Sequence, residues 1–366
     1  MLPNMKDLNF RKIVIKVGSN VLTNGEGQLD LTILGKLANQ ISQLKKEGKE
    51  IILISSGAVA SGRNIVKLPP KYDSISARQV LASVGQVKLL NHYYELFSKQ
   101  QIICSQVLVT KEDFRDRNHY LNMRNCLSAL LQNNILPIIN ENDVISITEL
   151  MFTDNDELAG LIATMMNAEL LVILSNVEGI YSGDPKNPDS VIINKIEDKS
   201  QDISKFIQNT KSEFGRGGMI TKSNMARKVA KSGITVKIAN GKRENILSDL
   251  LTDKNYSIGT TFIPVKTTSS SKKMIAFSDT FAKGVVYINE GAQKALFSSK
   301  ASSLLPVGII SIEGEFQKGD VVKIVTTDHV LLGLGKVEYS SKKAREIMGQ
   351  KNQKPVIHYD YLYLNE

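Results

Sequence analysis

Short apolar runs alternate with amphipathic stretches over the first two-thirds of the chain, and this alternation constrains the fold most. Between the first two runs, apolar side chains recur at helical spacing from Leu31 to Leu44. Asp30 is placed to cap this helix and Gly48 to end it. Strand, helix and strand in repetition require right-handed crossovers and a largely parallel sheet. The expected strands are 12–17, 50–55, 102–108, 136–139, 170–174 and 234–238, with further helices at 122–133 and 157–167.

The alternation stops near residue 265, where a polar stretch with nothing to bury is typical of a linker. Short β-rich runs separated by glycine-containing turns follow it. A chain of 366 residues also exceeds the ceiling of about 250–300 residues for one core. We therefore predict an α/β domain with a mainly parallel central sheet sandwiched by helices, and a second, small mostly-β domain. The expected boundaries are 1–262 for the α/β domain, 263–277 for the linker, 278–356 for the small domain and 357–366 for a C-terminal tail.

Composition excludes several classes of protein. The two cysteines, Cys104 and Cys126, are too few for a disulfide scaffold or a metal cluster and predict reduced thiols. The four histidines are scattered without metal-ligand spacing. The first residues carry no apolar signal segment, and no later apolar run reaches the ~18 residues of a membrane span. We expect a soluble, cytoplasmic protein with no membrane partner.

A net charge of +9 favours anionic partners, so an RNA-binding protein is one alternative. Residues 260–366 hold 14 Lys and Arg against 10 Asp and Glu, an excess of 4 out of the total 9. The charge is therefore not concentrated in the small domain, and no basic stripe with interleaved aromatic residues is present in the sequence. Surplus lysines on solvated faces explain the charge better, and RNA is not an expected partner.

Polar or glycine-rich segments follow four of the expected strands, at 16–20, 55–62, 140–143 and 175–179. Ligands bind at the carboxyl ends of the strands in an open parallel sheet. The first segment begins with Lys16, and the second has small residues whose backbone amides can approach an anion closely. Together these segments predict one composite site.

A glycine-rich loop at 214–224 opens a helix, with Lys222 in its first turns. A helix start offers free amides and a partial positive charge, and a lysine adds a point charge suited to phosphate. The loop is not a Walker A motif, because Ile220 stands where a glycine would be needed. A flexible turn before an ordinary helix is the alternative, and the pairing of Lys222 with Lys16 favours the phosphate site.

The segment 153–157 has three carboxylates and an amide at the start of another expected helix. Helix capping is the alternative explanation and accounts for at least one carboxylate. A carboxylate between two lysines would hold both ammonium groups, as phosphoryl transfer requires, because catalysis there is mostly positioning and charge neutralisation.

These motifs resemble those of the glutamate 5-kinase branch of the amino-acid kinase family. The matching segments are 16–22, 55–62, 139–143, 153–156 and 215–222, while 289–292 and 302–308 resemble the PUA domain of that branch. The resemblance implies an amino-acid kinase fold at 1–262 and a PUA-like domain at 278–356. It also implies ATP-dependent phosphorylation of the γ-carboxylate of L-glutamate to L-glutamyl 5-phosphate, the first step of proline biosynthesis.

The resemblance implies roles for individual residues. Lys16 and Lys222 would neutralise the transferring phosphoryl group as catalytic residues, and Asp156 would orient both lysines. The residues implied for glutamate are Ser56, Asp143 and Asn155, with Asn140 nearby. The residues implied for ATP are Lys16, Ser175, Asn176, Arg216, Gly217, Gly218, Met219, Ile220, Thr221 and Lys222. Arg216 and the pair Ser175 and Asn176 depart from the residues usual in the family, so the departures fall on the nucleotide side.

The resemblance further implies Mg²⁺ carried by ATP, with no metal ligands from protein side chains. It implies feedback inhibition by proline, a homo-oligomer (dimer or tetramer) and hand-over of the labile acyl phosphate to glutamyl phosphate reductase. The nearest alternative is a kinase of the same fold that acts on aspartate, acetylglutamate, carbamate or a nucleotide. The segment 140–143 and the C-terminal β-domain count against it.

Overall fold

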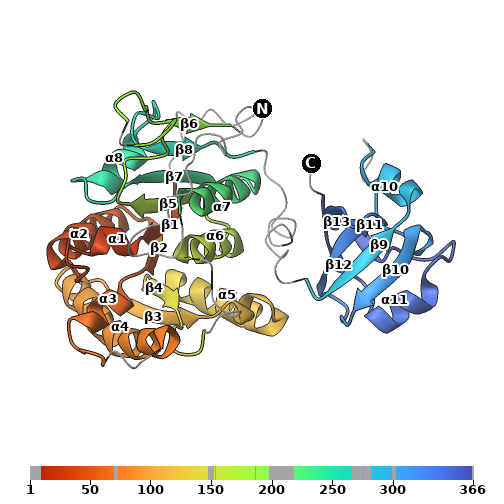
Figure 1. Ribbon diagram of the computed structural model, residues 1–366, viewed down its shortest axis with the longest axis horizontal. Helices are drawn as coiled ribbons and strands as arrows, with labels where there is room; N and C mark the ends of the chain where they lie inside the picture. Colours follow the sequence, from red (N-terminus) through yellow and green to blue (C-terminus); the bar gives the residue numbers. More distant parts are fainter. Residues whose placement is uncertain are drawn as a thin grey trace. The chain divides into compact units, whose positions relative to one another are not determined.

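The computed structural model describes residues 10–69, 73–146, 152, 154–185, 187–197, 218–265, 275, 282–298 and 302–364. The chain divides into two compact units (Figure 1). The larger comprises Met1–Asp113 and Leu121–Thr267, and the smaller comprises Phe114–Tyr120 and Thr268–Glu366. Most of the linker expected at 263–277 lies outside the described residues, so the expected domain boundaries stay predictions.

The larger unit is built on an eight-stranded sheet in the order β3-β4-β2-β1-β5-β7-β8-β6, which Figure 1 shows as a stack through the unit. All neighbouring strands are parallel except β7 and β8, which are antiparallel. The predicted α/β class with a mainly parallel sheet is therefore confirmed. The strands are β1 (Lys12–Val17), β2 (Glu50–Ser55), β3 (Cys104–Val109), β4 (Leu136–Glu141), β5 (Leu170–Ser175), β6 (Lys195–Ile196), β7 (Thr235–Asn240) and β8 (Thr260–Phe262).

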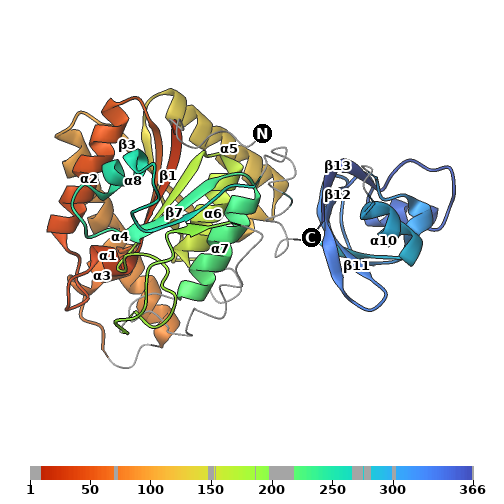
Figure 2. The ribbon, with the colours of Figure 1, turned by 90° about the horizontal axis from the view of Figure 1, so that it is seen from above.

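Helices cover both faces of this sheet (Figure 2). The helices on one face are α2 (Leu31–Lys46), α4 (Ser74–Ser98) and α8 (Ile246–Thr252), and those on the other are α5 (Arg117–Gln132), α6 (Asn155–Met165) and α7 (Met219–Lys231). The caps predicted for α2 are confirmed: the Asp30 carboxylate accepts hydrogen bonds from two amides of the first turn, and Gly48 has φ +80°. Of the helices in the described part of the chain, none is both long and apolar enough to cross a membrane.

Two short helices, α1 (Ser19–Leu22) and α3 (Ala58–Arg63), follow β1 and β2 directly. Helix α3 meets α4 backbone to backbone. A Cβ at Gly85 would lie 1.8 Å from the Ala58 carbonyl oxygen, and one at Gly62 would lie 2.0 Å from that of Leu81. Because only glycine fits at both positions, α4 packs closely beside the helix that leaves the carboxyl end of β2.

Strand β4 runs further than the sequence predicted, from the expected end at 139 to Glu141. The reason is pairing with the edge strand β3, in which Asn140 lies opposite Leu108 and Glu141 opposite Val109. Asn140 and Glu141 are therefore held by the sheet rather than by a loop.

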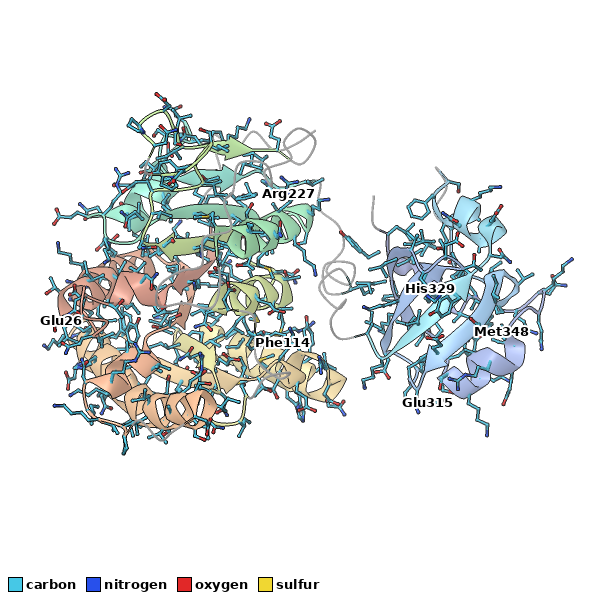
Figure 3. The ribbon with its side chains drawn as sticks, in the orientation of Figure 1. Glu26, Phe114, Arg227, Glu315, His329 and Met348 are labelled. Carbon is cyan, nitrogen blue, oxygen red and sulfur yellow. The ribbon has the colours of Figure 1, made fainter. Side chains whose placement is uncertain are left out.

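The smaller unit contains a five-stranded sheet in the order β10-β9-β11-β12-β13, which confirms the predicted small mostly-β domain. Its strands are β9 (Gly284–Ile288), β10 (Ile309–Gly314), β11 (Val321–Thr326), β12 (Leu331–Val337) and β13 (Ile357–Leu364), and its helices are α10 (Glu290–Leu296), η6 (Pro306–Gly308) and α11 (Ser341–Ile347). Glu315, labelled in Figure 3, pairs with Arg345 at 2.7 Å and so fastens α11 to the end of β10.

The expectation of a C-terminal tail at 357–366 is wrong for the residues that the structure describes. Residues 357–364 form β13, which pairs antiparallel with β12, and Leu362 lies opposite Gly335. The strand buries Ile357 and Leu362 in the core of the small unit, so this segment has apolar surface that a free tail would leave in water.

Candidate active site

A cavity of about 580 Å³ lies in the larger unit at the carboxyl ends of the parallel strands. Its walls come from the segments that follow β1, β2 and β5, from the end of β4 and from the starts of α6 and α7. This is the edge of the sheet at which the sequence predicted a composite site. The predicted site residues in the wall are Lys16, Ser56, Asn140, Asp143, Asn155, Asp156, Ser175, Asn176, Gly218, Met219 and Lys222.

Four predicted residues are not placed in this wall. Ile220 and Thr221 belong to the first turn of α7 but are not among the described residues that line the cavity. The Thr221 hydroxyl instead donates to the Gly218 carbonyl oxygen at 2.8 Å and to Asp154 Oδ2 at 3.3 Å, which ties the start of α7 to the start of α6. Arg216 and Gly217 lie outside the described residues.

Two lysines and one carboxylate form the charged centre of the cavity. Lys16 Nζ lies 2.6 Å from Asp156 Oδ1, and Lys222 Nζ lies 2.5 Å from Asp156 Oδ2. The three residues come from β1, α6 and α7, and each is at most 8% exposed. One buried carboxylate thus bridges two ammonium groups from segments more than 200 residues apart in the sequence.

The local sequence explains why these side chains converge. Gly18, just after the end of β1, lies against β5: its amide donates to the Leu174 carbonyl oxygen at 3.2 Å, and a Cβ there would lie only 3.2 Å from the same oxygen. The Asp154 side chain caps α6 by accepting hydrogen bonds from the amides of Asp156 and Glu157. The capping explanation therefore holds for Asp154, while Asp156, two residues on, is the carboxylate between the lysines.

The lysines of the bridge shift the pKa of Asp156, and Asp156 in turn shifts the pKa of Lys16. Burial alone would raise the pKa of Asp156, but attraction to Lys16 and Lys222 outweighs it and holds the pKa well below its usual value. Burial lowers the pKa of the Lys16 ammonium, although Asp156 opposes this. With all three groups ionised, two positive charges against one negative leave the bridge with a net charge of +1, and the carboxylate of Asp154 interacts with both lysines as well.

A polar network lines the part of the wall formed by α6, β4 and the start of α3. Asn155 Nδ2 donates to Ser56 Oγ at 2.9 Å and to Asn140 Oδ1 at 3.1 Å. Asn140 Nδ2 donates in turn to Gln86 Oε1 on α4 at 2.9 Å. The structure therefore brings together three of the predicted glutamate residues. It also shows Gln86 behind them, outside the residues that line the cavity, which sequence reasoning missed because nothing distinguishes it within a long helix.

Asp143, the fourth predicted glutamate residue, is paired with Arg78, which was also missed. Arg78 donates to Asp143 Oδ1 from Nε at 3.0 Å and from Nη2 at 2.6 Å. Its Nη2 also lies 3.8 Å from Glu141 Oε2. Glu141 Oε1 accepts the Phe152 amide at 2.9 Å, so this carboxylate also holds the backbone just before α6.

Glu141 makes stability depend on pH. Burial raises its pKa to about 7 from 4.5, so between these values the folded state holds a proton that the unfolded state has lost. The free energy of unfolding therefore falls as the pH rises from about 4.5 to about 7. We expect E141Q, which keeps an oxygen for the Phe152 amide, to remove this slope and to be more stable than the parent by about 1–3 kcal/mol at pH 8.

Urea denaturation of both proteins at pH 5, 6, 7 and 8 measures this effect. Equal stabilities at pH 5, where residue 141 is neutral in the folded state of both, provide the internal control. An unchanged pH slope in E141Q would assign the effect to another group.

The carboxylates of the cavity already make contacts within the protein. Among the described residues, no group of three or more His, Cys, Asp and Glu side chains could hold a metal ion. Asp154 already accepts hydrogen bonds from two amides and from Thr221. Mg²⁺ commonly keeps its waters and binds phosphates with one or two carboxylates, so these residues fit a metal that arrives on a nucleotide.

The family model for the amino acid kinase family matches residues 11–240, and the model for the PUA domain matches residues 284–359. The chain belongs to the amino acid kinase family. Glutamate 5-kinase of Bacteroides thetaiotaomicron is 56% identical over 356 residues, covering 97% of this chain and 99% of the relative. Glutamate 5-kinase of Chlorobaculum tepidum is 50% identical, covering 97% and 98%. The resemblance found in the sequence is confirmed.

Solved structures agree with the fold. The product complex of isopentenyl phosphate kinase from T. acidophilum has a TM-score of 0.50 and 17% identity, covering 69% of this chain and 99% of that protein. Carbamate kinase from Giardia lamblia bound to AMP-PNP has a TM-score of 0.50 and 19% identity, covering 70% and 99%. At these identities the likeness supports the fold alone.

Proposed function

We propose that this chain transfers the γ-phosphoryl group of ATP to the γ-carboxylate of L-glutamate, forming L-glutamyl 5-phosphate in the first step of proline biosynthesis. Relatives named glutamate 5-kinase match nearly its whole length. The observation that carries the proposal is the bridge of Lys16, Asp156 and Lys222, in one cavity with a wall of amides and carboxylates.

In this proposal Lys16 and Lys222 neutralise the charge that develops on the transferring phosphoryl group, and Asp156 holds both ammonium groups in place. Phosphoryl transfer needs little covalent chemistry from the protein, so positioning and charge supply most of the catalysis. The placement of the two ammonium groups on one carboxylate supports this role. Mg²⁺ bound to ATP would add positive charge at the phosphates.

The nucleotide would lie against the segment after β5 and the start of α7. Ser175, Asn176, Gly218 and Met219 are in the cavity wall, which supports this placement. The first amides of α7, a helix of 13 residues, can bind phosphate oxygens. We assign the ATP contacts to these residues together with Lys16, Lys222 and the remainder of the segment 216–222.

Glutamate would lie against Ser56, Asn140, Asp143 and Asn155. Asp143 offers a carboxylate for the α-ammonium group, and the hydroxyl and amides offer polar contacts for the rest of the substrate. The γ-carboxylate is ionised and nucleophilic at neutral pH, so the reaction needs no general base.

The function predicts a strong preference for one acceptor. Purified protein should form hydroxylamine-trapped γ-glutamyl phosphate with L-glutamate, ATP and Mg²⁺, at a rate at least 100-fold above that with L-aspartate, because aspartate is one methylene too short to reach both ends of the site. The measurement is ADP release with glutamate, aspartate, N-acetylglutamate, carbamate and a nucleoside monophosphate. A faster reaction with any acceptor other than glutamate would overturn the assignment.

The proposal extends to partners. The acyl phosphate product hydrolyses readily, so we propose hand-over to glutamyl phosphate reductase, with proline as feedback inhibitor and a dimer or tetramer as the working form. We place the enzyme in the cytoplasm, which the free thiols of Cys104 and Cys126 support.

A further inference from the structure

Arg78 is a charged side chain in the cavity wall whose chemistry the proposed function leaves unused. It lies in the second turn of α4, its side chain is 32% exposed, and it contacts two carboxylates, Asp143 and Glu141, that are at most 7% exposed. Its Nε and Nη2 make these contacts. Its Nη1 has no hydrogen-bond or ion-pair partner among the residues that the structure describes.

This corner holds one cation and two carboxyl groups. Arg78 is paired with Asp143, and burial raises the pKa of Glu141 to about 7, so Glu141 carries a full negative charge only above that pH. Burial also raises the pKa of Asp143, and the attraction of Arg78 opposes this rise. An α-amino acid brings an ammonium and a carboxylate together, and a corner with an arginine and an aspartate can take both.

On the proposed function, we propose that Arg78 receives the α-carboxylate of glutamate while Asp143 receives its α-ammonium. The charges of Arg78 and Asp143 then alternate with the two opposite charges of the substrate. A guanidinium matches a carboxylate with parallel hydrogen bonds, and the unpaired Nη1 is available for one of them.

The other cations of the wall are less suited to this role. Lys16 and Lys222 are bound to Asp156, at the phosphoryl end. Arg63, at the end of α3, lines the cavity but is exposed, so its ion pair with a substrate would be weakened by water. Arg78 alone among these four lies directly beside Asp143.

The assignment predicts that two substrate analogues distinguish the role of Arg78 from the role of Asp143. L-Glutamate α-amide keeps the shape and the ammonium but has no α-carboxylate charge, and glutarate keeps both carboxylates but has no ammonium. R78Q should raise the KM for glutamate at least 30-fold with the KM for ATP within twofold, and should lower kcat/KM for glutamate and glutarate but not for the α-amide. D143N should lower kcat/KM for glutamate and the α-amide but not for glutarate.

The experiment follows acyl phosphate by hydroxylamine trapping, or the inhibition constant of each analogue against glutamate where its turnover is too slow. R78K should recover part of the glutamate affinity, and K88Q, an exposed change on the same helix outside the cavity wall, should leave all constants unchanged. Thermal melting of each variant reports whether it is folded.

Two outcomes would overturn the role of Arg78: an unchanged KM for glutamate in R78Q, or an equal loss with glutamate and its α-amide in folded R78Q. A parent protein that prefers another acceptor would overturn the proposed function itself, so the two failures are distinguishable.

Discussion

Replacing Lys222 with alanine is expected to lower kcat on the order of 10³-fold, about 4 kcal/mol of transition-state stabilisation, with little change in the fold. The ammonium group would be missing where charge develops on the phosphoryl group. Folding should survive because Asp156 keeps Lys16 at 2.6 Å, so the variant leaves a neutral pair instead of an isolated charge. Single-turnover kinetics with saturating ATP and glutamate, together with circular dichroism, measure both effects.

The matched control is K231A, which removes a lysine from the other end of the same helix, outside the cavity wall. It should keep kcat within about twofold, because Lys231 lies outside the wall of the cavity in which the phosphoryl group would be transferred. A folded K222A with nearly normal turnover would remove Lys222 from the mechanism.

Replacing Asp156 with asparagine should reduce both stability and activity. Lys16 and Lys222 would then lie almost fully buried without their shared carboxylate, which leaves two like charges facing a neutral amide. Removing one partner from a buried ionic group costs about 3–5 kcal/mol. We expect the free energy of unfolding of D156N to fall by this amount at pH 7, and kcat to fall at least 10²-fold as the lysines lose their orientation.

The pH dependence gives this prediction a second readout. In the parent protein the pKa of Asp156 is lowered from 3.8, so its stabilisation is present above that value and is lost as the pH falls below it. Burial lowers the pKa of Lys16 from 10.5, and without Asp156 it should fall further. D156N should therefore gain stability as the pH rises toward 10.5, where the buried lysine can shed its proton.

E157Q serves as the control because Glu157, the next residue on α6, pairs with Lys111 at 3.1 Å and lies outside the cavity wall. Its loss of stability should be clearly smaller than that of D156N, with kcat within about twofold. Equal stability of D156N and the parent at pH 7 would show that the bridge contributes nothing to folding.

The sheet and its charged centre could be predicted because their signals are local. The caps of α2 lie within the helix sequence, and the carboxyl ends of parallel strands must share one edge, which groups Lys16 with the segment before α6. Arg78 could not be predicted, since its partner Asp143 is 65 residues away and only the packing of α4 brings them together. Strand β13 was missed because it is a strand only through its pairing with β12, which is a tertiary contact. A short apolar run has the same sequence pattern whether it is paired in a sheet or free.

The glycine contact between α3 and α4 has a consequence for how the acceptor pocket can change. With no side-chain atoms between the two backbones, neither helix can slide or rotate without displacing the other, since close-packed interfaces shift as wholes. Arg78 and Gln86 on α4 therefore travel with Ser56 at the head of α3. A partner or effector that pushes on the outer face of α4 would move Arg78, Gln86 and Ser56 together, while Asn140 on β4 and Lys16 on β1 are held in place by the sheet.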